Sequence, residues 1–110
     1  LATDEPRVYG HDSVPSKDHF VYVGEWTIAS EYAESGDDAM LMLNFFASDV
    51  HLVLGGEGEV NVSMVNSDYT ATVEVDGTTD LYDLYEGDPT DDVMILEFSP
   101  GIEAYAFTFG

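Results

Sequence analysis

The pattern that most constrains the fold is the alternation of apolar and polar residues in short runs from residue 19 onward. A strand points successive side chains to opposite faces, whereas an amphipathic helix repeats its apolar positions every 3.6 residues. No helical period is sustained over roughly 11 residues from His19 onward. Turn-forming Gly, Pro, Asn and Asp residues separate the runs. The chain is therefore expected to be all-β.

The expected strands cover nine short ranges: 19–24, 26–33, 39–46, 50–54, 59–66, 69–76, 80–86, 92–99 and 103–109. Eight or nine strands at this spacing are typical of an antiparallel β-sandwich, here of jelly-roll type. Residues 1–18 are expected to form a lead-in segment or linker, because Pro6, Gly10 and Pro15 interrupt them. Residues 19–110 then form a single domain.

The charge balance excludes several kinds of partner. The chain has 23 acidic and 2 basic residues, and its formal net charge is −21. Phosphate backbones and anionic membrane surfaces would be repelled almost everywhere, so nucleic-acid and membrane contacts are not expected. Because salt screens such repulsion, the acidic surface predicts adaptation to a high-salt environment. The alternative is a specific function, such as binding calcium or a cationic partner.

The motifs that carry catalysis or metal binding are not evident. Cysteine is absent, which excludes disulfides and thiolate redox chemistry within the chain. His11, His19 and His51 have no metal-ligand spacing, and His51 is expected at the surface or rim. The Asp-rich turns at 37–38 and 88–92 do not fit a calcium-binding loop and are interpreted as solvated turns, with calcium binding as the alternative. No enzyme activity, cofactor or metal is therefore predicted.

Aromatic side chains are the candidates for ligand contact, because flat rings stack on the apolar faces of sugars. Tyr32, Tyr82 and Tyr85 are expected to be partly exposed and to provide such a platform. Positions 82 and 85 differ in strand parity, so one of these two rings is expected to face away from the other. Trp26 alternates with Ile28 and is expected to point into the core.

Four segments carry a resemblance to a known family. They are Gly24-Glu25-Trp26, the run 49–55 (DVHLVLG), the run 81–85 (LYDLY) and the closing run 100–110 (PGIEAYAFTFG). In this order they resemble the thioredoxin-like C-terminal domain family, over most of residues 20–110. The resemblance implies a β-sandwich similar in fold to carbohydrate-binding modules. It also implies a place after a thioredoxin domain, in extracytoplasmic thiol-disulfide proteins of the cytochrome c biogenesis type.

Three runs, at 39–46, 50–54 and 93–98, are apolar on both faces, so the sequence also predicts an interface. Such strands are covered on both sides or expose a patch. The residues expected to point away from the core are Met40, Met42, Phe46, Val53, Val93 and Ile95, with Ala104 and Ala106 beside them. We expect the lead-in segment, the linked thioredoxin domain or another copy of the chain to cover them. Burial inside the sandwich is the alternative, and would follow from a β-bulge that shifts the parity.

Two functions remain after these exclusions. The first is a non-catalytic accessory domain of an extracytoplasmic thioredoxin-type protein, which binds a carbohydrate or a protein partner. The second is a purely structural or interaction module, which packs on the thioredoxin domain or self-associates. In both cases the expected location is extracytoplasmic, in an organism that lives at high salt.

Overall fold

The chain forms an antiparallel β-sandwich. The computed structural model describes residues 6–10 and 15–109. Its strands are β1 (Pro6–Tyr9), β2 (His19–Ile28), β3 (Ala33–Ser35), β4 (Met40–Met64), β5 (Thr70–Asp76), β6 (Asp80–Phe98) and β7 (Ile102–Phe109). The described residues include no helix that could cross a membrane. The predicted all-β fold class is confirmed.

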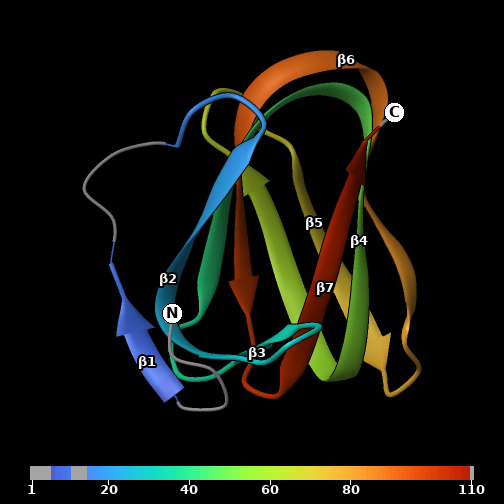
Figure 1. The fold of residues 1–110 in the computed structure, drawn as a ribbon. Coiled ribbons are helices and arrows are strands. Elements are labelled where there is room, and N and C mark those ends of the chain that lie inside the picture. Colours follow the sequence, from blue (N-terminus) through green and yellow to red (C-terminus); the bar gives the residue numbers. More distant parts are fainter. Residues whose placement is uncertain (1–5, 11–14, 110) are drawn as a thin grey trace.

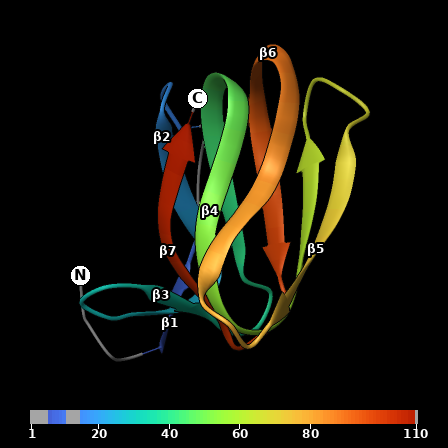
Figure 2. The same ribbon diagram turned by 90° about the vertical axis from the view of Figure 1, so that its right-hand side faces the viewer.

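Two long strands, β4 and β6, bend the continuous sheet into two layers. β4 pairs with β6 along 40–47, again along 49–54, and once more along 60–64, with register shifts between these stretches. The larger layer contains β1, β2, both ends of β4, the second half of β6, and β5. The smaller layer contains β3, β7, the middle of β4 and the first half of β6. Both long strands arch over the same end of the molecule (Figures 1 and 2).

The bends explain why fewer strands are found than were expected. The expected strands at 39–46, 50–54 and 59–66 are one strand, because the chain keeps pairing as it turns. At Gly56 the backbone has a φ of +79°, and a Cβ there would lie 2.2 Å from the Gly101 carbonyl oxygen. Only glycine allows this turn and this close approach together.

Part of the expected lead-in segment belongs to the sheet. β1 pairs with residues 24–27 of β2, and the Pro15 carbonyl accepts a hydrogen bond from the Asn44 side chain. Residues 1–5 and 11–14, and with them His11, lie outside the described residues.

The core lies between the two layers. Trp26 is fully buried, as predicted, and its Nε1 donates to the Val23 carbonyl oxygen at 2.9 Å. The prediction for Ala104 was wrong, because this residue belongs to the core whereas Ala106 is exposed. The cause is a register shift in the pairing of β7 with β4, which changes the parity between these two alanines.

Candidate functional site

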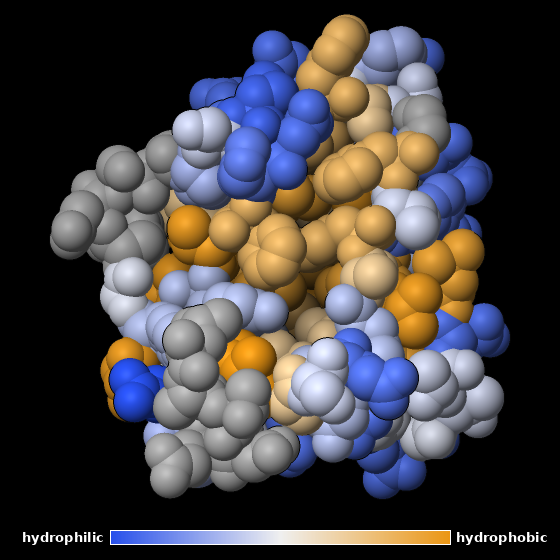
Figure 3. Space-filling view, in the orientation of Figure 1, coloured by the Kyte–Doolittle hydropathy of each residue, from blue (hydrophilic) through white to orange (hydrophobic). Residues whose placement is uncertain are grey.

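The first candidate surface is at an open edge of the sandwich, between β2 and β7. Residues 19–23 of β2 and 107–109 of β7 each pair with β4 on one side. Among the described residues, no strand pairs with the other side of either stretch. An apolar surface bordered by hydrophilic side chains lies over this region (Figure 3). The edge therefore exposes both apolar side chains and unpaired backbone groups.

Four rings form what we call the aromatic groove: Phe20, Tyr22, Phe107 and Phe109. The Phe20 ring centroid is 5.4 Å from that of Tyr22 and 5.3 Å from that of Phe107. The Phe107 and Phe109 rings are nearly parallel, with centroids 6.3 Å apart. Phe20 and Phe109 remain 41% and 43% exposed. A hollow of about 40 Å³ between the strands reaches the core residues Leu41 and Leu52.

Tyrosine hydroxyls beside the groove stay protonated at neutral pH. Burial, and next the nearby Tyr9 hydroxyl, raise the pKa of Tyr22 above its ordinary value. Tyr105, which lines the same hollow, donates to Glu103 at 3.0 Å, and this hydrogen bond is the largest cause of its raised pKa. These phenols can therefore exchange hydrogen bonds with an uncharged polar ligand.

The second candidate surface is the outer face of the larger layer. Met42 lies opposite both Val21 and Ile95, and Met40 lies opposite Val23. Met42 and Val93 are only 7% and 8% exposed, although neither belongs to the core cluster. These side chains therefore lie on the side of the sheet away from the core, where other residues of the chain already cover most of Met42 and Val93.

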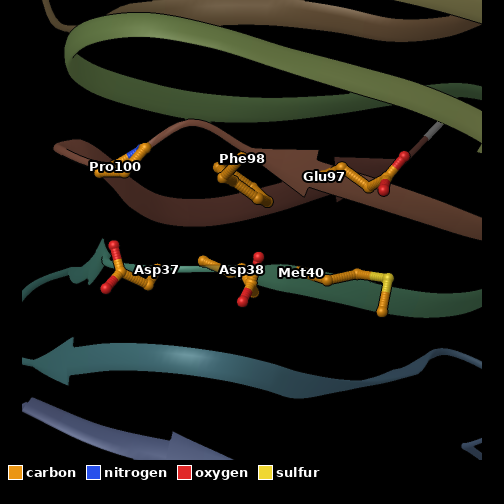
Figure 4. Close-up of a pocket in the computed structure, with 7 residues that line it drawn as sticks. Asp37, Asp38, Met40, Glu97, Phe98 and Pro100 are labelled. Atoms are coloured by element: carbon orange, nitrogen blue, oxygen red, sulfur yellow. The ribbon is translucent and has the colours of Figure 1, made fainter.

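A cavity of about 660 Å³ lies at one end of this outer face. It is lined by Asp37, Asp38, Ala39, Met40, Glu97, Phe98 and Pro100. Figure 4 shows Met40 and Glu97 on adjacent strands, with Asp37 and Asp38 just before β4 begins. Three carboxylates beside a methionine favour a ligand group that is both cationic and partly apolar.

The structure separates the residues of the predicted interface. Met40, Met42, Val93 and Ile95 share the outer face of the larger layer. Phe46 lies where β4 bends and is 62% exposed. Val53 lies on the outer face of the smaller layer, opposite Leu81.

The three predicted tyrosines are half-buried and lie in separate environments. Tyr32 contacts Tyr105, with ring centroids 5.3 Å apart. Tyr82 donates to the Thr78 carbonyl oxygen at 3.2 Å. Tyr85 packs between Phe45 and Tyr69 and donates to the Asp88 carbonyl oxygen at 2.7 Å.

The expectation that Tyr82 and Tyr85 face opposite ways was wrong. Both rings pack against the core. Val50 is opposite Tyr85 and His51 is opposite Asp83, so Leu84 is an extra residue in β6. This β-bulge restores the inward direction at Tyr85.

Sequence reasoning missed the aromatic groove, because alternation shows which rings share a face but not which strands lie at an edge. The sequence pattern that could have indicated the groove is the repeat of aromatic residues at alternate positions, in 20–22 and again in 105–109.

Comparison with known proteins adds a family and a fold. A model of the thioredoxin-like C-terminal domain family matches residues 1–110. Protein DipZ of Mycobacterium bovis and Protein DipZ of Mycobacterium tuberculosis are each 31% identical to the chain over 93 residues. The match covers 83% of this chain but 13% of each DipZ, so the chain spans a small part of these relatives.

A solved structure shares the fold. The structure of a family two carbohydrate esterase from Cellvibrio japonicus matches 84% of this chain and 30% of that chain, with a TM-score of 0.72. Because the sequence identity is 11%, this likeness concerns the fold alone.

Proposed function

Because the chain belongs to the thioredoxin-like C-terminal domain family, as its sequence motifs predict, we propose that it is a non-catalytic accessory domain that binds a carbohydrate. The observation that carries this proposal is the aromatic groove, which presents exposed ring faces beside unpaired strand edges. The domain serves an extracytoplasmic protein and is covalently linked there to a thioredoxin domain. Thiol chemistry would belong to that domain, because this chain has no cysteine.

The groove offers both kinds of contact that a sugar needs. The exposed faces of Phe20 and Phe109 can stack on the C–H faces of a pyranose ring. The free backbone groups of β2 and β7, together with the Tyr22 and Tyr105 hydroxyls, can pair with sugar hydroxyls. Ring contacts of about 0.5–1.5 kcal/mol each suggest dissociation constants in the millimolar to micromolar range.

Titration with oligosaccharides tests the proposal, and Trp26 provides the signal. Its ring is 5.2 Å from that of Tyr22, which contacts Phe20, so ligand in the groove should change the fluorescence of the only tryptophan. We expect Phe20→Ala to weaken binding about tenfold. Val8→Ala, at an exposed residue of β1, should leave it unchanged.

The same titration separates the groove from the tyrosine platform predicted from the sequence. If Tyr32→Ala, Tyr82→Ala or Tyr85→Ala weakens binding while Phe20→Ala does not, sugar binding stands but its site is the tyrosines. If no oligosaccharide of a broad panel binds the folded wild-type chain, carbohydrate binding is wrong.

A second candidate function, an interaction module, rests on the outer face of the larger layer. The apolar residues Met40, Met42, Val93 and Ile95 lie on that face, and Met40 also lines the cavity formed with Asp37, Asp38 and Glu97. We infer that this face packs on the linked thioredoxin domain.

In a protein that contains both domains, Ile95→Asp should increase their relative motion in NMR relaxation. The exposed control Leu81→Asp on the other layer should have no such effect, and equal relaxation in all three proteins would contradict the inference.

A further inference from the structure

Three side chains that could ligate a metal meet on the outer face of the smaller layer. His51 on β4 lies directly opposite Asp83 on β6, and its Nε2 is 3.0 Å from the Asp83 Oδ1. A ligand atom of Glu86 completes the set, and all three ligand atoms lie within 4.8 Å of one another. His51 is 20% exposed, so the neighbouring strands restrict its imidazole, whereas both carboxylates are exposed.

The β-bulge at Leu84 creates this arrangement. In a regular strand Asp83 and Glu86 would face opposite sides, because two residues separate them. Here Leu84 is fully buried and Tyr85 also packs inward, so the parity changes between the two acids. Both carboxylates consequently lie on the same side as His51. Bulges often redirect side chains at functional sites in this way.

We propose that His51, Asp83 and Glu86 bind one divalent ion of the zinc class. Zinc bonds to histidine nitrogen and carboxylate oxygen are about 2.0–2.2 Å long, which places neighbouring ligand atoms of a tetrahedral site roughly 3.3–3.6 Å apart. The 3.0 Å separation of the His51 and Asp83 atoms is close to that value. The exposed Glu86 side chain is free to rotate the remaining distance. Three protein ligands leave the fourth position for water or for a ligand of the domain.

The ligand types determine which ion is favoured. Calcium and magnesium prefer an all-oxygen set of six or more ligands, whereas an imidazole favours zinc, nickel and copper. The net charge of −21 raises the local concentration of every cation, so affinity alone does not identify a site. The imidazole is the part of this cluster that discriminates between cations.

Calorimetric titration with zinc chloride tests the proposal, on metal-free protein in 0.5 M KCl with 5 mM calcium chloride to suppress non-specific binding. We expect one zinc ion per chain. His51→Ala and Asp83→Asn should each weaken binding at least tenfold. His19→Ala is the matched control and should bind as the wild type does, because the exposed His19 ring contacts the Lys17 carbonyl oxygen and lies outside the cluster.

Two measurements keep the result interpretable. Asp83→Asn changes an exposed side chain and should keep the thermal midpoint of the wild type, so lost binding there is not lost folding. NMR should show the His51 ring signals shifting on zinc addition while those of His19 do not. Equal zinc affinity in the wild type and in His51→Ala would overturn the proposal. So would the absence of zinc binding to the wild type in the presence of 5 mM calcium chloride.

Discussion

Gly24 is the residue at which the backbone path of β2 depends most on the absence of a side chain. Its φ is +85°, and a Cβ there would lie 2.0 Å from the Asp38 carbonyl oxygen. The residue after it, Glu25, donates its backbone N–H to the Asp37 carbonyl oxygen at 3.1 Å. Gly24 therefore allows β2 to approach the turn that leads into β4. Asp37 and Asp38 of this turn form one wall of the acidic cavity.

We expect Gly24→Ala to lower the free energy of unfolding by more than about 2 kcal/mol, since it combines an unfavourable φ with a backbone clash. Gly77 provides the matched control. Its φ is +97°, but an added Cβ would meet its nearest neighbour at 3.8 Å. Gly77→Ala should therefore cost only the backbone strain, about 1–2 kcal/mol. Urea unfolding measures both variants, and equal losses would show that the close approach at Gly24 does not contribute.

At the scale of strands, the sequence predicts where chain segments are extended but not how they pair. Alternation identified the strand ranges and placed Trp26 in the core, because burial depends on side-chain polarity and period. The bulge at Leu84 leaves no such mark, since it depends on which strand lies opposite. The closeness of His51 and Asp83, the inward direction of Tyr85 and the edge position of Phe20 all depend on pairing between distant segments.

Asp92 is a buried polar residue that joins two such segments. The residue is 4% exposed, and its Oδ1 accepts hydrogen bonds from the backbone N–H groups of Asn66, at 2.9 Å, and Val93, at 2.7 Å. The bond to Asn66 ties the turn between β4 and β5 to β6. The hydrogen bond to Val93 is buried, so removing its acceptor would leave a buried N–H unpaired and subject to the desolvation penalty.

We expect Asp92→Ala to destabilise the fold by about 1–3 kcal/mol and to speed hydrogen exchange at the Asn66 amide. Asp92→Asn retains an acceptor oxygen and should lose less. The exposed Asp88 supplies a control. Asp88→Asn should change the free energy of unfolding by no more than about 0.5 kcal/mol and should leave hydrogen exchange at the Asn66 amide unchanged. Unchanged exchange at Asn66 in Asp92→Ala would contradict this role.

Over the whole molecule, repulsion between acidic groups opposes the packing of the core. Neighbouring strands place like charges directly opposite one another, in the pairs Glu57–Asp76, Glu59–Glu74 and Glu34–Glu103. Such pairs destabilise a sheet by roughly 0.2–1 kcal/mol each. The described basic side chains offset little of this, since Lys17 pairs with Asp91 at the surface. The net charge of −21 over a surface of 5936 Å² corresponds to one charge roughly every 17 Å, about twice the Debye length at physiological salt. At that salt the repulsion therefore acts mainly within such close pairs, and it extends over the whole surface as the salt concentration falls.

We therefore expect the unfolding midpoint to rise strongly with KCl between 0.05 and 2 M, because the Debye length falls to about 3 Å at 1 M. Glu74→Lys combined with Asp76→Lys converts two repulsive cross-strand pairs into attractive ones. This variant should be more stable than the wild type at low salt and should depend less on KCl. Thr70→Lys combined with Thr72→Lys also adds two lysines to β5 but removes no carboxylate, so it changes the net charge by +2 rather than +4 and should have a smaller effect. A midpoint that stays flat from 0.05 to 2 M KCl would show that the acidic surface is not a salt adaptation.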